Sequence, residues 1–339
     1  MPTLAGSLLR GALLSPFRRP RADAAFPRAP LTLPEVRIDL ARLAAYERIC
    51  GFPTGEDALP PTYPHVLGFP LAMRLMSARA FPLPLLGLVH TSFDLTRHTA
   101  LPATAAYELS VRVEGLAPHR RGTEAAVLTE LRSGGQTVWE SRSTYLARHG
   151  TDRPADPRTG RTTTPPSGQT TTPATGQTAA SATGRATTPA TDQTATPATG
   201  QTTEPATGPT TTPATDQTTT PATDAASALP PLAAWPLGGD LGRRYAAVSG
   251  DRNPIHLHPL TARLFGFPRP IAHGMWTLAR CLAAHGTPDA VRVRARFLAP
   301  VPLPGTVEFA AEKGRFALRG GGRVHLTATV DPLGSGPRR

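Results

Sequence analysis

A long central segment of this chain lacks the residues that build a hydrophobic core, and it divides the sequence into two halves. Within residues 151–228 an eight-residue unit recurs, with Pro-Ala-Thr steps that begin at Pro173, Pro189, Pro197 and Pro213. These repeats contain no Leu, Ile, Val or Phe, so they bury too little apolar surface to offset the entropy lost on ordering. We predict a long disordered linker with polyproline II character. An O-glycosylated stalk is the weaker alternative.

The bulk properties limit the class of protein. At 339 residues the chain can hold two domains, each with its own core. Cys50 and Cys281 are far apart in sequence and lack metal-type spacing, which fits a cytoplasmic protein without a disulfide framework. No apolar run is long enough for a transmembrane helix, so no membrane span is expected.

The chain is strongly basic. Its formal net charge is +12, and Lys313 is the only lysine among the basic residues. This charge would attract an anionic ligand, but an arginine-rich solvated surface explains it more simply. Neither a zinc pattern nor a helix-turn-helix or aromatic–basic RNA motif accompanies the charge, so we predict no nucleic-acid partner.

The two halves resemble divergent copies of one unit. Tyr46–Gly51 in the first half corresponds to Tyr245–Gly250 in the second, and alternating runs typical of strands follow both. In the second half Asp251 is followed by Asn253-Pro254-Ile255-His256, a carboxylate and an imidazole that could act together. In the first half Phe52 occupies the place of Asp251 and no Asn-Pro-x-His follows. We therefore expect the first copy to be catalytically inactive.

These features divide the chain into four parts. We predict an N-terminal extension at 1–33, a degenerate first domain at 34–150, the linker at 151–228 and a catalytic second domain at 229–335. Arginines in the extension leave a targeting leader open, but the apolar core of a secretory signal is missing.

Periodicity predicts an α+β fold. Helices are expected from the capping residue Asp39 to Ile49, over 66–78, and over 271–284. Alternation predicts strands at 36–38, 88–93, 106–113, 124–132 and 137–147, and again at 291–297, 306–313, 315–319 and 324–330. Gly320–Gly322 should turn the last hairpin. A long helix followed by antiparallel strands, twice over, suggests two sheets that each wrap around a helix.

One short stretch of the second half carries candidate chemistry. Asp251 and His256 lie five residues apart, with Asn253 and Pro254 between them. A carboxylate and an imidazole on one rigid turn can act as an acid/base pair, one on a proton bound to carbon and the other on an oxygen. Further along, Gly274 is expected near the start of a helix, where its N–H could stabilise an oxyanion.

This stretch resembles the signature of the MaoC-like dehydratases, also called R-specific or type 2 enoyl-CoA hydratases. The positions that match the family pattern are Tyr245, Ser249, Gly250, Asp251, Asn253, Pro254, Ile255, His256 and Gly274. The resemblance implies that Asp251 and His256 are the catalytic pair, that Asn253 holds their geometry, and that the N–H of Gly274 is an oxyanion donor. It also implies a double hot-dog fold, in which one chain imitates the homodimer of simpler hydratases.

The resemblance implies a reversible dehydration of (3R)-hydroxyacyl thioesters, carried on CoA or on an acyl carrier protein, in fatty acid metabolism. No cofactor is expected. His256, His258 and His273 show no convincing ligand spacing, so we predict no metal. An acyl-thioesterase and a non-catalytic acyl-binding scaffold remain alternatives. Either a monomer or a homodimer fits, and the separate acid and base roles stay open.

Further residues are candidates for substrate binding. Ser249 and Gly250 belong to the catalytic turn, where Ser249 is also expected to support the backbone. Arg292, Arg294 and Arg296 alternate with apolar residues, so the three share one face of a strand, where they could contact CoA phosphates or a carrier protein. A solvated strand face is an equally good interpretation.

Overall fold

A computed structural model describes residues 20–85, 87–149 and 226–334 of the chain. The linker predicted at 151–228 lies outside the described residues except for its last three positions. The first part of the predicted N-terminal extension also lies outside them.

The first lobe contains two helices and five strands. In chain order they are β1 (Leu31–Arg37), α2 (Leu40–Cys50), α3 (Tyr63–Ser77), β2 (Leu88–Arg97), β3 (Ala106–His119), β4 (Gly122–Ser133) and β5 (Gln136–Arg148). The Asp39 side chain caps α2 as predicted, because it accepts a hydrogen bond of 3.0 Å from the backbone N–H of Arg42. α3 begins three residues before the predicted 66, since Pro64 suits the first turn of a helix.

The second lobe repeats this plan with extra short helices. It consists of β6 (Pro231–Leu237), α5 (Leu241–Ser249), the 3-10 helix η3 (Pro254–His256), α6 (Pro259–Leu264), α7 (Gly274–His285), β7 (Val291–Phe297), β8 (Gly305–Glu312), β9 (Arg315–Gly320) and β10 (Arg323–Pro332). Helix α7 begins at Gly274 and not at the predicted Ile271, because Ile271 forms a β-bridge with Pro302. Gly321 and Gly322 turn the last hairpin with φ angles of 56° and 71°.

All ten of these strands form one antiparallel sheet. Its order is β1-β3-β4-β5-β2-β7-β10-β9-β8-β6, so the second lobe mirrors the first about the β2–β7 pair. The two sheets predicted from the sequence are therefore halves of a single sheet, joined where β2 pairs with β7 in antiparallel register. Phe93 of β2 lies opposite Ala295 of β7, which puts these two buried residues on the same face.

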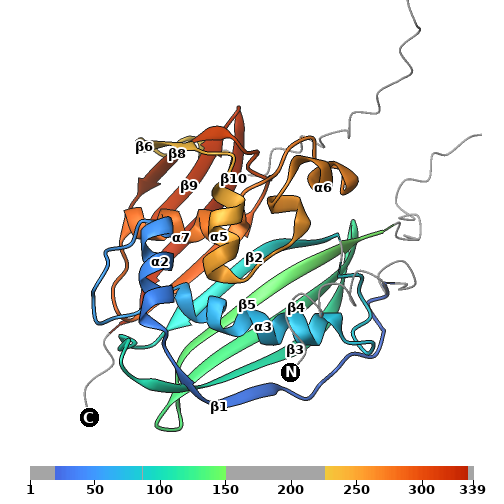
Figure 1. Cartoon of the computed structure of the whole chain (residues 1–339), viewed down its shortest axis with the longest axis vertical. Coiled ribbons are helices and arrows are strands. Elements are labelled where there is room, and N and C mark those ends of the chain that lie inside the picture. The colour runs from blue at the N-terminus through green and yellow to red at the C-terminus, as the bar shows by residue number, and fades with distance from the viewer. Residues whose placement is uncertain (1–19, 86, 150–225, 335–339) are drawn as a thin grey trace, which may run out of the picture. The chain divides into compact units, whose positions relative to one another are not determined.

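The long helices cover that same face. α3 packs against β3 and β4, and α7 packs against β9. Figure 1 shows α3 lying across the strands of the first lobe and α2 beside α5 of the second. One core of buried residues runs through both lobes, with Trp139, Tyr46, Tyr245 and Phe93 among its largest members. Two half-sheets, each wrapped on a long helix, form the double hot-dog fold that the sequence predicted.

A buried arginine joins the lobes. Arg97 at the end of β2 is 4% exposed, and its guanidinium donates hydrogen bonds to the carbonyl oxygens of Leu59, Pro288 and Asp289. Residues from both halves of the sequence are therefore held by one side chain. Across the described ranges of the chain, none of the helices is long and apolar enough to cross a membrane.

Candidate active site

The turn after α5 holds the candidate carboxylate. Gly250 ends α5 in the left-handed conformation, with φ 81°, which any other residue would adopt at a cost. The backbone N–H of Asp251 then donates to Ser249 Oγ at 3.2 Å. One carboxylate oxygen of Asp251 accepts from the backbone N–H of Asn253 at 3.1 Å. These bonds fix the direction in which the Asp251 side chain leaves the turn.

His256 follows at the end of η3. The Asn253 side chain caps this short helix by accepting from the backbone N–H of Ile255. His256 Nδ1 lies 2.7 Å from the carbonyl oxygen of Ile271, and only a protonated Nδ1 can bond there. In the neutral ring, Nε2 therefore carries the lone pair. His256 is thus arranged as a base with its reactive nitrogen on the side away from Ile271.

His273 completes the cluster. Its Nε2 donates to the backbone carbonyl of Asp251 at 3.0 Å, and its ring stacks on that of His256 with a centroid distance of 3.7 Å. Tyr245 packs against the same ring, with a centroid distance of 4.9 Å. His273 therefore ties the turn that bears Asp251 to the start of α7. The sequence singled out this histidine only as a possible metal ligand and did not predict its positioning role.

The three side chains converge. Asp251, His256 and His273 each place a potential ligand atom within 4.8 Å of the others. Such groups could hold a metal ion, but the imidazole rings stack with an angle of only 27° between their planes. A histidine lone pair lies in the plane of its ring, and two nearly parallel planes do not meet at one nearby ion. The arrangement favours acid/base work between a carboxylate and an imidazole.

Burial shifts the pKa of the carboxyl and the pKa values of the two imidazoles in opposite directions. Burial raises the pKa of Asp251, and the charge of His256 and the bond from Asn253 offset part of that effect. Burial lowers the pKa of His256, with partial offset from the Asp251 carboxylate. The pKa of His273 lies well below its ordinary value for the same reason. Both imidazoles are therefore neutral at pH 7, and Asp251 holds a proton more readily than an exposed carboxyl does.

Gly274 provides the backbone N–H predicted as an oxyanion donor. It is the first residue of α7, where an N–H has no carbonyl partner inside the helix. A Cβ at this position would lie 3.2 Å from ring carbons of Phe297, so glycine lets that ring lie over the helix start. The N–H thus sits at the positive end of a twelve-residue helix beside an aromatic wall.

Gly242 positions the site although it lies outside the motif. A Cβ on Gly242 would come within 1.9 Å of the carbonyl oxygen of His256. Helix α5 can therefore approach the candidate catalytic turn only because a glycine stands in its first turn. The sequence did not predict this role of Gly242, because a single glycine near the start of a helix is common.

Two of the predicted substrate-binding residues, Ser249 and Gly250, form part of the turn itself. Ser249 is 3% exposed, and its hydroxyl is used by the backbone of Asp251. Gly250 ends α5. Both residues shape the turn that carries Asp251, as expected for Ser249, and their contact with substrate stays a prediction.

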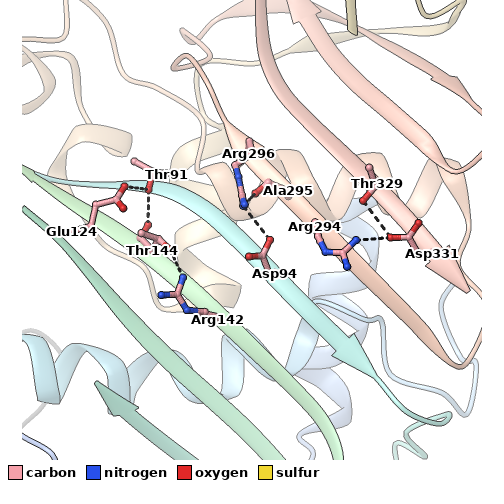
Figure 2. Close-up of polar contacts among 10 residues, drawn as sticks. All are labelled: Thr91, Asp94, Glu124, Arg142, Thr144, Arg294, Ala295, Arg296, Thr329 and Asp331. Carbon is pink, nitrogen blue, oxygen red and sulfur yellow. Dashed lines mark hydrogen bonds and ion pairs between the residues drawn. The ribbon is translucent and has the colours of Figure 1, made fainter. Parts of the chain in front are cut away.

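The three arginines of β7 point away from this cluster. Phe297 faces α7, so the even-numbered residues of the strand lie on the opposite side of the sheet. Figure 2 shows Arg294 paired with Asp331 and Arg296 with Asp94 on that outer face, at 2.9 Å and 3.1 Å. Arg292 is also exposed there. These exposed pairs fit the solvated-face interpretation, and contact of the three arginines with CoA phosphates or a carrier protein stays a prediction.

The first lobe lacks the corresponding chemistry. Helix α2 ends at Gly51 with φ 79°, as α5 ends at Gly250. After Gly51 comes Phe52, whose ring stacks on Tyr46 at a centroid distance of 6.4 Å. Where the second lobe presents a carboxylate, the first presents an apolar packing contact.

The comparisons with known proteins agree with this geometry. A profile of the MaoC like domain matches residues 212–331. The chain is 32% identical over 335 residues to 3-hydroxyacyl-thioester dehydratase X of Mycobacterium tuberculosis, which covers 96% of this chain and 97% of that protein. It is also 46% identical over 65 residues to the peroxisomal enoyl-CoA hydratase 2 of Arabidopsis thaliana, 17% of this chain and 21% of the plant protein.

A solved structure extends the match to the fold. The crystal structure of HtdX from Mycobacterium tuberculosis superimposes with a TM-score of 0.64 at 30% identity, and covers 90% of this chain and 100% of HtdX. Sequence and fold agree along nearly the whole length of both proteins. The chain belongs to the family of MaoC-like dehydratases.

Proposed function

We propose that the protein is a hydro-lyase that dehydrates (3R)-hydroxyacyl thioesters and, in reverse, adds water to trans-2-enoyl thioesters. The observation that carries this proposal is the convergence of Asp251 and His256 beside the first N–H of α7. The dehydratase and hydratase names of the relatives support the same reaction. The acyl group is carried on CoA or on an acyl carrier protein, and the chemistry at C2 and C3 is the same for both.

In the dehydration direction, Nε2 of His256 takes the proton from C2. The electron pair of that C–H bond becomes the C2–C3 double bond as the C3–O bond breaks. The carboxyl of Asp251 gives its proton to the departing hydroxyl, which leaves as water. The neutral state of His256 and the raised pKa of Asp251 favour this division of roles.

The thioester oxygen gains negative charge as C2 loses its proton. The N–H of Gly274, at the start of α7, is placed to donate to that oxygen. His273 and Asn253 hold the Asp251 turn in register, and the Ile271 carbonyl holds the tautomer of His256. The first lobe contributes no acid or base at the position of Phe52.

Substitution of the pair tests this proposal. Asp251→Asn removes the carboxyl proton donor with little change of shape, and His256→Ala removes the base. We expect each to lower kcat/KM for crotonyl-CoA hydration by about 10²–10⁴-fold. The exposed His258 on the same loop is the matched control, and His258→Asn, which can still cap α6, should keep the full rate.

The assay follows the loss of enoyl-thioester absorbance and determines the configuration of the 3-hydroxy product. Circular dichroism checks that each variant is folded. Wild-type rates in either variant, or a 3S product, would contradict the proposal. Release of free thiol without loss of the double bond would identify a thioesterase instead.

A further inference from the structure

We propose that His65 and His90 in the first lobe form a polar recognition site for an oxygen atom on the acyl chain, a hydroxyl or a ketone beyond C4. The inference rests on the proposed function and names the substrate class more narrowly. Neither histidine belongs to the catalytic motif or takes part in the proposed chemistry.

The two histidines face each other across the inside of the first lobe. His65 lies on α3 and His90 on β2, and their rings stack with a centroid distance of 6.1 Å. Phe93 meets both edge-on, at 5.1 Å from His65 and 6.1 Å from His90. The pair is thus set into an aromatic surface on the face of the sheet that α3 covers.

That surface reaches the oxyanion donor. The His90 ring lies 4.9 Å from the ring of Phe297, across the β2–β7 junction. Phe297 in turn lies against Gly274. An acyl chain whose thioester oxygen binds the Gly274 N–H would pass Phe297, then His90, and then His65. This series of contacts is the path that we infer for the acyl chain, with the histidines beyond the reacting carbons.

A second ring contact of His90 is with Tyr145 on the neighbouring strand. The His90 ring stacks on Tyr145 of β5 with a centroid distance of 4.6 Å. Burial is the main cause that raises the pKa of the Tyr145 phenol, and the Asp251 carboxylate adds to that rise. Tyr145 is therefore within electrostatic reach of Asp251. The first lobe approaches the active site from this side as well.

The histidines carry hydrogen-bonding atoms that the folded chain does not use. His65 Nδ1 and His90 Nε2 are buried, and neither has a hydrogen-bond partner among the residues that the structure describes. A buried polar atom without a partner costs about 1–3 kcal/mol, which a phenylalanine or leucine at the same place would avoid. Such atoms are rare in native proteins and mark a missing partner. An acyl oxygen would supply it.

The charge state of the pair limits what it can bind. Burial lowers the pKa of His65 to about 4, and burial together with His65 lowers that of His90 to about 3. Both rings are therefore neutral at pH 7, with one donor and one acceptor nitrogen each. Neutral imidazoles suit a hydroxyl or a ketone, whereas a carboxylate on the chain would find no positive charge here.

The test compares pairs of substrates in wild-type and variant enzymes. Each pair consists of a plain trans-2-enoyl-CoA and one of equal length with a hydroxyl or ketone at one position from C5 to C10. The variants are His65→Phe and His90→Phe, which keep an aromatic ring and remove the nitrogens. His98→Phe is the control, since His98 is an exposed histidine at the far end of the same strand region.

We expect wild type to prefer the oxygenated partner at one or two positions by about tenfold in kcat/KM, the effect of one neutral hydrogen bond at about 1.4 kcal/mol. The preference should disappear in both variants, with the plain substrate within about twofold of wild type. Equal losses on both substrates, or no preference in wild type, would contradict the histidine site. Inactivity of wild type on every substrate would instead contradict the proposed dehydratase function.

A binding measurement does not depend on folded variants. The ¹⁵N signals of the two histidines in the wild-type protein are followed with saturated acyl-CoA ligands that cannot react. We expect the oxygenated ligand to shift these signals and the plain ligand to leave them nearly unchanged. Identical spectra with both ligands would overturn the inference.

Discussion

The role of Gly242 in holding the catalytic turn can be tested with a single methyl group. In Gly242→Ala the new Cβ would lie 1.9 Å from the His256 carbonyl oxygen, whereas real Cβ contacts essentially never fall below 3.0 Å. Helix α5 and the turn must therefore move apart by about 1.1 Å (3.0 − 1.9 Å). Asp251 follows α5 directly, so the shift separates it from His256.

The size of the effect follows from that displacement. A misplacement of about 1 Å costs about 10²-fold in rate, or about 2.7 kcal/mol in the barrier. Overpacking lowers the free energy of unfolding by about 1–3 kcal/mol. We expect Gly242→Ala to remain folded at 20 °C and to lose about 100-fold in kcat/KM for enoyl-CoA hydration.

Gly239 provides the matched control in the preceding turn. A Cβ there would meet only a side-chain carbon of Pro304 at 3.7 Å, an ordinary contact, so Gly239→Ala should keep both rate and stability. The hydration assay and urea unfolding are run on both variants. A wild-type rate in Gly242→Ala would refute the view that this close approach sets the distance between Asp251 and His256.

Two further predictions concern stability. The pKa values of His65 and His90 fall from 6.5 to about 4 and about 3 on folding, so their contribution to stability is complete above pH 6.5 and is lost as the pH falls. At pH 5 each of the two histidines should lower the free energy of unfolding by up to about 2 kcal/mol relative to pH 7. Urea titrations at the two pH values measure this drop, which should be smaller in a variant with both histidines changed to Phe. Arg97→Leu leaves three carbonyl groups without their donor, two of them in the second lobe, and should lower the free energy of unfolding by about 3 kcal/mol, as measured by thermal unfolding. The exposed ion pair between Arg294 and Asp331 is the control, because Arg294→Ala should lower the free energy of unfolding by less than about 1 kcal/mol.

Local patterns in the sequence predicted the local structure well. Asp39 was expected to cap a helix and does so, and the strand predicted at 291–297 has those same ends in β7. Alternation and capping act between near neighbours, so a window of a few residues contains their full cause. The shape of the candidate catalytic turn could also be predicted, because Asp251, Asn253 and His256 lie on one short segment whose hydrogen bonds are mostly internal, while their catalytic roles stay a prediction.

These local patterns could not predict contacts between residues that are far apart in the sequence. Alternation showed that the β7 arginines share a face, but only the packing of Phe297 on α7 decides which face it is. The β2–β7 pairing joins residues about 200 positions apart and makes one sheet of the two that were expected. The bond from His273 to the Asp251 carbonyl likewise depends on where α7 meets the turn.

The first lobe supports the second although it carries Phe52 where the second carries Asp251. Helices α2 and α5 both end on a left-handed glycine, and the rings of their tyrosines, Tyr46 and Tyr245, lie 6.2 Å apart in the shared core. Arg42 of α2 donates at 2.7 Å to the carbonyl of Val248, three residues before Asp251. The first lobe therefore supports the helix from which the catalytic turn leaves. Phe52 can replace a carboxylate there because that support depends on backbone and packing, and not on a charge.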